Sequence, residues 1–262
     1  MPYNSIVVVR EAWDTRDLLP NVVTETGQLN DGVLSRRFEP EDLNALEMAL
    51  QIRDDHGGTV TAISLGASHD VDVLRESLFR GVDNVVRVLP PDGAALDTAA
   101  QAELLAAAIR KVDAYDLVLT GVSVPEGENS LLGAELATRL GHSRITYVDS
   151  LTEITADNVK CKREIEMGSE FVRAPLPAVL VLGVYLLKDD PRTPRSAKAK
   201  LKLKKKKVPI PESTAAELGL AEPATKITVA GYQAIPPREV DTKDVDPEDN
   251  SALQAMLQDI RS

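Results

Sequence analysis

The stretch from Gly121 to Gly133 is the part of this sequence whose residue types and spacing first suggest chemistry. It reads Gly-Val-Ser-Val-Pro-Glu-Gly-Glu-Asn-Ser-Leu-Leu-Gly, which is typical of a strand end, a loop and a helix start. Free amides at a helix start bind anions such as phosphate. The same residues also suit an ordinary strand-to-helix turn capped by Asn129 or Ser130, and spacing alone favours that simpler interpretation.

Other catalytic and ligand-binding patterns are missing from the sequence. Ser123 follows an expected strand, but a nucleophile elbow needs glycine where Pro125 stands, and the only later histidine is His142. No G-x-G-x-x-G or P-loop motif occurs. The single cysteine excludes an internal disulfide framework or iron–sulfur cluster, and the three histidines share no metal-ligand spacing. Cys161, with a lysine on either side, fits a small strand residue better than a reactive thiolate.

Charge is unevenly distributed along the chain. The formal net charge is −11, with acidic residues concentrated in Glu39–Glu47 and Asp241–Asp249, yet seven of the ten residues from Lys198 to Lys207 are lysine. Such a run is most often solvated, but on an acidic body it also suggests a docking surface. The acidity and the aromatic content of 3% argue against a nucleic-acid binder.

Hydrophobic periodicity predicts alternating strands and helices over the first 141 residues. We expect strands at Ser5–Val9, Thr59–Leu65, Asn84–Val88 and Asp116–Thr120, a hairpin around Val22–Leu29, and helices from Pro40 to His56 and at Val71–Phe79, Leu96–Val112 and Asn129–Leu140. Such alternation predicts an α/β fold, a parallel sheet with helices on both faces. Ligands of such sheets bind beyond the carboxyl ends of the strands, which singles out the loops Arg10–Asp14, Gly66–Asp70 and Gly121–Glu128.

The pattern changes after Gly141. Short runs predict antiparallel additions and one more central strand, at Thr146–Ile154, Val159–Ile165, Glu170–Ala174 and Val179–Leu182. Residues 208–262 have too few apolar side chains for a core of their own, so this extended arm, ending in a helix at Ser251–Ile260, needs its own domain or a partner to lie on. We therefore expect an α/β domain at 1–187, a recognition loop and Lys-rich segment at 188–207, and an arm at 208–262 that wraps a partner.

Length and apolar content are sufficient for a sizeable core. The chain has 262 residues, of which 43% are hydrophobic. No secretory signal is visible at the N-terminus, and the longest apolar run, Ala178–Leu187, is too short to cross a bilayer. The expectation is a soluble, cytoplasmic protein.

Several spaced motifs resemble those of the β subunits of electron transfer flavoproteins. Arg163-Glu164-Ile165-Glu166-Met167-Gly168-Ser169-Glu170 followed by Leu176-Pro177-Ala178-Val179 is similar to the signature of that family, and Lys204–Lys207 resembles its basic segment. Earlier motifs occur in the family's order: Val7-Val8-Val9-Arg10 with Asp14-Thr15, Phe38–Asp42 with Ala45–Glu47, Ser64–Gly66, and Arg75–Leu78 with Gly81–Asp83. The resemblance spans residues 5–210.

This resemblance implies an electron-carrying heterodimer and no free-standing enzyme. The larger α subunit would hold most of a redox FAD. This chain would have a fold of the adenine-nucleotide α-hydrolase or flavodoxin type and bind AMP, in preference to the second FAD of electron-bifurcating members. By position, the family's nucleotide contacts fall on Val8, Glu39, Leu65, Glu126, Gly127, Glu128, Asn129, Ser130, Leu131, Leu132 and Gly133.

Two of these positions depart from the family pattern. Glu39 stands where the family usually has asparagine, and Leu132 where threonine or valine is common. A carboxylate at position 39 would oppose a phosphate but could accept hydrogen bonds from ribose hydroxyls.

A third departure concerns docking to a redox partner. The family's recognition loop carries an anchoring leucine and a methionine, and both are missing from Pro191–Lys198. A buried leucine contributes about 1.5–3 kcal/mol. We therefore expect contact by charge, through Arg192, Arg195, Lys198 and Lys200, with an acidic surface of a dehydrogenase or other redox protein.

Two other hypotheses remain open at this stage. The chain could be a stand-alone adenine-nucleotide-binding regulatory protein, similar to stress proteins, or, less favoured, a nucleic-acid binder that uses its lysine run. The signature between Arg163 and Val179 and the long arm favour the electron carrier.

Overall fold

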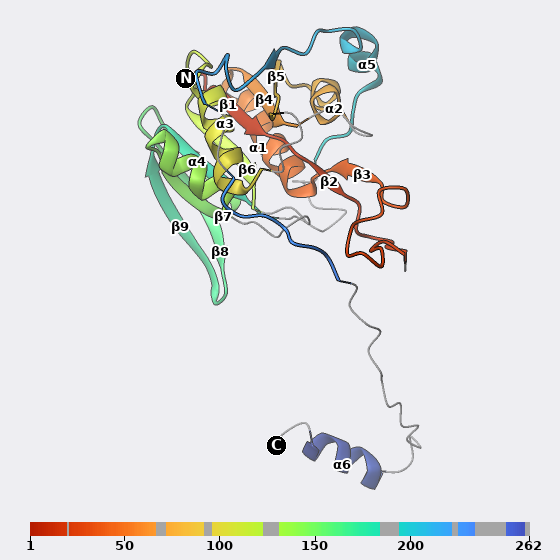
Figure 1. The fold of residues 1–262 in the computed structure, drawn as a ribbon. Coiled ribbons are helices and arrows are strands. Elements are labelled where there is room, and N and C mark those ends of the chain that lie inside the picture. Colours follow the sequence, from red (N-terminus) through yellow and green to blue (C-terminus); the bar gives the residue numbers. More distant parts are fainter. Residues whose placement is uncertain are drawn as a thin grey trace.

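The computed structural model describes residues 1–19, 21–66, 72–91, 96–122, 131–183, 194–221, 225–233 and 250–259. Its centre is a nine-stranded sheet in the order β11-β5-β4-β1-β6-β10-β7-β8-β9. These strands are β1 (Ser5–Val8), β4 (Val60–Leu65), β5 (Asn84–Val88), β6 (Leu117–Gly121), β7 (Ser143–Ile154), β8 (Asn158–Ile165), β9 (Gly168–Pro175), β10 (Ala178–Leu182) and β11 (Glu212–Ser213). Neighbours from β11 to β7 are parallel, whereas β7, β8 and β9 pair antiparallel (Figure 1). The predicted parallel sheet with antiparallel additions is confirmed.

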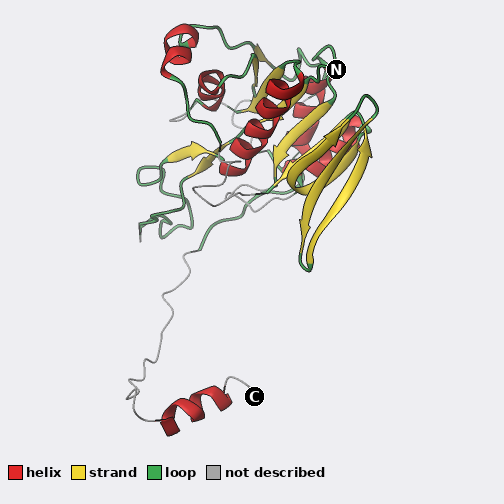
Figure 2. Cartoon of the chain, turned by 180° about the vertical axis from the view of Figure 1, so that it is seen from behind, coloured by secondary structure: helices red, strands yellow, loops and turns green. Residues whose placement is uncertain are grey.

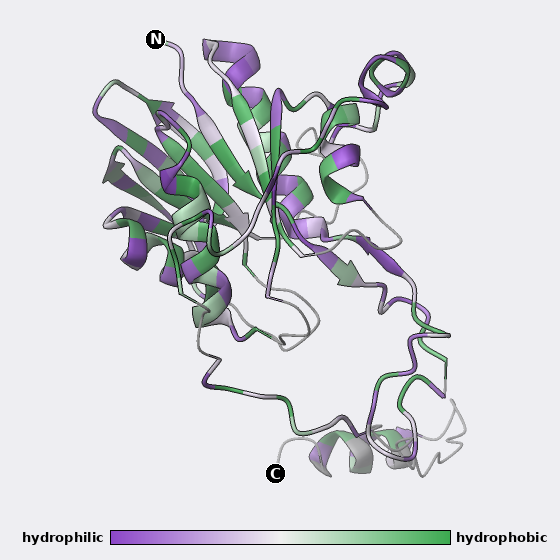
Figure 3. Ribbon diagram, turned by 45° about the horizontal axis from the view of Figure 1, so that its top comes forward, coloured by the Kyte–Doolittle hydropathy of each residue, from purple (hydrophilic) through white to green (hydrophobic). Residues whose placement is uncertain are grey.

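Helices cover both faces of the parallel part of the sheet (Figure 2). Helices α1 (Pro40–His56) and α2 (Val73–Arg80) share one apolar cluster with the sheet, and α3 (Thr98–Arg110) and α4 (Leu132–Leu140) share the other. Alternate side chains of β1 serve the two layers, Val7 in the first cluster, Ile6 and Val8 in the second. A strand buried on both faces is apolar throughout, as the hydropathy colouring of the central strands shows (Figure 3).

Helix α1 begins at Pro40, as its sequence predicts. Proline suits the first helical position for two reasons. Its fixed φ is helical, and the N–H that it lacks would have no partner within the helix at that position. The carboxylate of Glu39 accepts a hydrogen bond from the amide of Glu41, and the helix ends at Gly57, whose φ is 82°. The other helices predicted before Gly141 are found as α2, α3 and α4, and their ends differ from the predicted ones by a few residues.

Four short elements of the structure are not predicted from the sequence. Strands β2 (Glu11–Trp13) and β3 (Arg36–Phe38) form a separate antiparallel pair, in which the guanidinium of Arg36 lies 3.7 Å from the ring centroid of Trp13. A short helix, α5 (Ala199–Lys205), forms in the Lys-rich segment. The fourth is β11, which extends the sheet beside β5. These elements are too short to be predicted, because a hydrophobic periodicity can be recognised only over more residues than they have.

The C-terminal arm leaves the α/β domain later than expected. Strand β11 pairs with β5, and Leu218, 9% exposed, packs into the cluster of α3 and α4. Further on, the amides of Lys226 and Ile227 donate to Asp97 Oδ2, and the amide of Tyr232 donates to the carbonyl of Gly27. Helix α6 (Asn250–Asp259) stands apart from the sheet (Figure 1).

Candidate functional site

The carboxyl ends of β1 and β6 mark a topological switch point of the sheet. From β1 the chain winds through β4 to β5 on one side, and from β6 it continues to β7 on the other. Ligands of open α/β sheets bind at such a point. Val8 ends β1 and is fully buried, while Leu65 ends the adjacent β4 and is half-buried. Two of the predicted nucleotide contacts therefore lie on neighbouring strand ends.

A fully buried carboxylate, that of Asp42, joins the carboxyl ends of β1 and β6 to the start of α1. Its Oδ2 accepts from the amide of Arg10 at 2.9 Å and from Arg10 Nε at 2.8 Å. Its Oδ1 accepts from Arg10 Nη2 and from the amide of Gly121, both at 2.8 Å. Burial opposes the charge of Arg10, but Asp42 more than offsets this, so the pKa of Arg10 is raised. Asp42 therefore fixes the geometry of the switch point.

Glycine is required at position 121 because α1 approaches β6 very closely there. A Cβ at Gly121 would lie 2.5 Å from Glu41 Cβ and 2.8 Å from Asp42 Oδ1. From the sequence alone, Gly121 is expected only to mark the end of a strand. The backbone approach explains it better.

The expected phosphate loop is only partly described. Glu126, Gly127, Glu128, Asn129 and Ser130 lie outside the described residues. Leu131 is 59% exposed at the start of α4 and gives that helix no side-chain cap. An uncapped helix start is compatible with an anion, whose oxygens would accept from its first amides.

Leu132 and Gly133 have structural reasons for their identity. Leu132 is 2% exposed and belongs to the core that α3 and α4 share with the sheet. A Cβ at Gly133 would lie 2.3 Å from Val181 Cγ2, so glycine lets α4 pack directly on β10. Their proposed part in phosphate binding therefore rests on backbone amides alone.

The docking residues predicted between 192 and 200 behave differently from one another. Arg192 lies outside the described residues, and Lys198 and Lys200 are exposed. Arg195 instead pairs with α1: its Nη2 lies 2.8 Å from Glu47 Oε1, its Nη1 lies 2.8 Å from Asp54 Oδ2, and its amide donates to Glu47 Oε2. Hydrogen bonds to Glu47 raise the pKa of Arg195. The structure therefore gives Arg195 an intramolecular role that the sequence did not indicate.

The Lys-rich segment is held against α2. The amide of Lys198 donates to the carbonyl of Phe79, and Lys205 Nζ donates to the carbonyl of Val82 at 2.5 Å. Arg75 Nη1 donates to the carbonyls of Lys205 and Val208. These contacts leave the other lysines of the segment exposed, together with Leu203, which is 87% exposed.

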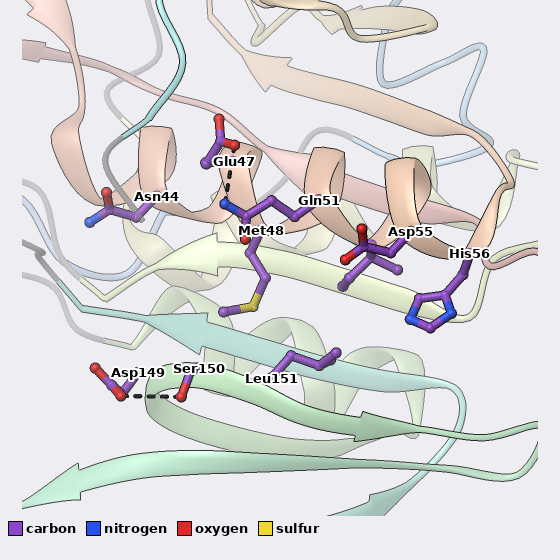
Figure 4. A pocket seen from close by; sticks show the side chains of 10 residues that line it. Asn44, Glu47, Met48, Gln51, Asp55, His56, Asp149, Ser150 and Leu151 are labelled. Carbon is purple, nitrogen blue, oxygen red and sulfur yellow. Dashed lines mark hydrogen bonds between the residues drawn. The ribbon is translucent and has the colours of Figure 1, made fainter. Parts of the chain in front are cut away.

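A pocket of about 140 Å³ lies between α1 and β7 (Figure 4). Its lining is mixed: Asn44, Glu47, Met48, Gln51, Ile52, Asp55, His56, Asp149, Ser150 and Leu151. Glu47 already binds Arg195, and Asp149 lies 3.4 Å from Lys162 Nζ. Two of its three carboxylates thus have partners within the chain.

Cys161 is buried in β8, and burial raises the pKa of its thiol to about 12. The interpretation as a small strand residue is confirmed. No cluster of three or more potential metal ligands occurs among the described residues, and no helix there is long and apolar enough to span a membrane.

The parallel sheet, with helices on both faces and antiparallel strands at one edge, defines a protein of the α/β class. Comparison with known proteins makes this more specific. The profile of the electron transfer flavoprotein domain matches residues 27–218. The chain therefore belongs to the electron transfer flavoprotein family, and the resemblance noted in the sequence is confirmed.

Individual relatives agree with this family. The chain is 34% identical over 177 residues to the electron transfer flavoprotein subunit beta of Thermoanaerobacterium thermosaccharolyticum. The aligned region covers 68% of this chain and 66% of that protein. It is 32% identical over 183 residues to the protein FixA of Azorhizobium caulinodans, and the aligned region covers 68% of this chain and 64% of FixA. It is 33% identical over 188 residues to CarD, a subunit of the caffeyl-CoA reductase–Etf complex of Acetobacterium woodii. Here the aligned region covers 71% of this chain and 70% of CarD. The matches thus span about two thirds of the length of these relatives.

Proposed function

We propose that this chain is the β subunit of a heterodimeric electron transfer flavoprotein. Electrons would pass between a dehydrogenase and an acceptor through FAD held mainly by an α subunit, and this chain would carry no catalytic acid or base. Its family membership and its similarity to proteins named as beta subunits support this role. The alternative, a stand-alone regulatory nucleotide binder, has no support from these relatives.

The proposed structural cofactor of this chain is AMP, with a second FAD as the alternative. The residues present fit an adenine nucleotide at the switch point: the half-buried Leu65 offers apolar surface at the end of β4, and α4 begins with amides that no described side chain caps. Val8 is fully buried at the end of β1, so its part would be that of its backbone. This chain's part would be to bind and orient the nucleotide, while the flavin supplies the redox chemistry. Val8, Glu39, Leu65 and the segment 126–133 are the residues assigned to this site.

The arm is proposed to lie on the α subunit. Its described residues include exposed apolar side chains, with Ile227 75%, Val229 65% and Leu257 59% exposed. Such side chains stabilise a complex when a partner buries them. The exposed Lys198 and Lys200, with Arg192, are proposed to contact the redox partner.

Co-expression with the candidate α subunit tests this proposal. Size-exclusion chromatography with light scattering should give a one-to-one complex, and its absorbance spectrum should be that of bound flavin. The isolated chain should aggregate or be less stable. A well-behaved monomer that binds flavin tightly without a partner would contradict the proposal.

A further inference from the structure

Glu39 is a buried carboxyl group with only one of its two oxygens satisfied. The residue is 5% exposed and precedes α1, with its amide donating to the carbonyl of Arg10 at 3.0 Å. Its Oε1 accepts from the amide of Glu41 at 3.4 Å, while its Oε2 is buried and has no hydrogen-bond partner. Capping of the helix therefore explains one oxygen and leaves the other unexplained.

The charged groups around Glu39 do not compensate for this. Arg10 is the nearby cation, but its Nε and Nη2 both donate to Asp42. Asp42 and Glu41 are further acids on the same turn of α1. Burial and then the charge of Asp42 raise the pKa of Glu39 to about 7, in spite of the opposing effect of Arg10.

A buried acceptor without a partner can be satisfied in two ways. Either the carboxyl group holds a proton, or a ligand donates a hydrogen bond to it. Glu39 lies at the switch point of the sheet, where the proposed nucleotide binds, beside the amides that begin α1. Asparagine, which the family usually has here, could not couple binding to a proton.

We infer that Glu39 makes nucleotide binding proton-linked: its ionised Oε2 accepts a hydrogen bond from a ribose hydroxyl of an adenine nucleotide, so the carboxyl group must release its proton as the nucleotide binds. This inference rests on the proposed nucleotide site. It adds a specificity residue, and it gives the site a dependence on pH that an asparagine would not give.

The expected size of the effect follows from linkage. A carboxyl group with a pKa of about 7 is ionised in about a tenth of molecules at pH 6 and nine tenths at pH 8. The apparent affinity for AMP should therefore rise about tenfold between pH 6 and pH 8. The phosphate of AMP also titrates near pH 6, so the effect of Glu39 is the difference between the native chain and a variant that cannot ionise.

Isothermal titration with AMP of the complex between the full-length chain and the α subunit, after removal of bound AMP, provides the test. The native chain, Glu39→Gln and Glu39→Asn are compared at pH 6, 7 and 8, with circular dichroism to check folding. Gln keeps the size of the side chain and Asn is a good helix cap, so at least one variant should fold. The native chain should show the tenfold rise, and both variants should show only the shallow dependence that comes from the phosphate.

Deoxynucleotides identify the donor. Titration of the native chain with 2′-deoxy-AMP and 3′-deoxy-AMP should show that one analogue binds more weakly at pH 8 and loses the pH dependence, because its donor is missing. An affinity that falls as the pH rises would overturn the inference, since Glu39 would then donate a proton. So would equal pH profiles for the native chain and the variants. Absence of AMP binding at every pH would instead contradict the nucleotide site itself.

Discussion

At the switch point Arg10 pairs with a fully buried Asp42, whereas in the Lys-rich segment the partly exposed Arg195 pairs with the nearly buried Glu47 and the exposed Asp54. The first pair joins two central strand ends to a helix. The second ties a peripheral segment to the side of α1. A buried charge must keep its partner, while an exposed one can exchange it for water, so these regions should respond differently to mutation, pH and salt.

Removal of Asp42 should have the largest effect on stability. Asp42→Ala would leave Arg10 buried without its counter-charge and the amide of Gly121 without its acceptor. We expect a loss of about 3–5 kcal/mol in the free energy of unfolding, measured by denaturant titration. Glu153→Ala, which breaks an exposed ion pair between β7 and Arg173 of β9, should cost less than 1 kcal/mol. Equal losses for the two variants would contradict the contrast between the regions.

Glu39 should make the nucleotide-free chain less stable as the pH rises. Its folded pKa of about 7 lies above the ordinary 4.5, so the folded state binds the extra proton between these values. Stability is therefore present below pH 4.5 and lost as the pH rises through 7, by about 2–3 kcal/mol. Glu39→Gln should remove this slope between pH 5 and pH 8 in thermal unfolding curves. An unchanged slope would show that Glu39 ionises normally.

The glycine at the start of α4 provides a packing test. Gly133→Ala would place a methyl group 2.3 Å from Val181 Cγ2 and should cost about 1–3 kcal/mol. Gly183→Ala is the matched control, because nothing lies within 4 Å of the added carbon. If the control loses as much stability as Gly133→Ala, close packing is not the reason for glycine at 133.

Arg195 should contribute less than Asp42 does. Arg195→Ala leaves Glu47, whose side chain is 8% exposed, without its main partner, and we expect a loss of about 1–2 kcal/mol. Lys200→Ala, at an exposed position, should change the free energy of unfolding by less than about 0.5 kcal/mol. If Arg195→Ala is as silent as this control, the pairing with α1 does not hold the segment.

The smallest effect on stability is expected for the docking lysines. Reversal of Lys198 and Lys200 to glutamate should leave unfolding and the flavin spectrum unchanged but slow association with an acidic redox partner. Stopped-flow reduction across a salt series measures this, because salt screens exposed charges. A rate that is flat with salt and equal in the variant would exclude electrostatic docking by these residues. Arg195 is a poor choice for this test, since its replacement also disturbs α1.

Local sequence predicted much of the fold and less of the site. The start of α1 is encoded in adjacent residues, Glu39 and Pro40, and the central strands in continuous apolar runs. Asp42 could not be recognised, because its partners Arg10 and Gly121 lie 32 and 79 residues away along the chain. The same holds for Arg195, which is 148 residues from Glu47.

Residue identity alone was also ambiguous at the phosphate loop. Leu132 and Gly133 fall at positions implied by the family's nucleotide site, yet the structure shows that both serve the packing of α4. A packing requirement and a ligand contact can select the same residue, and only the tertiary contacts reveal the first. Glu39 is the opposite case, since its unsatisfied oxygen is left over after packing and capping are accounted for.

Mass spectrometry of the nucleotides released from the purified complex with the α subunit tests the assignment most directly. A β subunit with a structural nucleotide predicts one FAD and one AMP per heterodimer. Two FAD per heterodimer would replace AMP with a second flavin at the switch point. A complex without any flavin would contradict the role of this chain in an electron transfer flavoprotein.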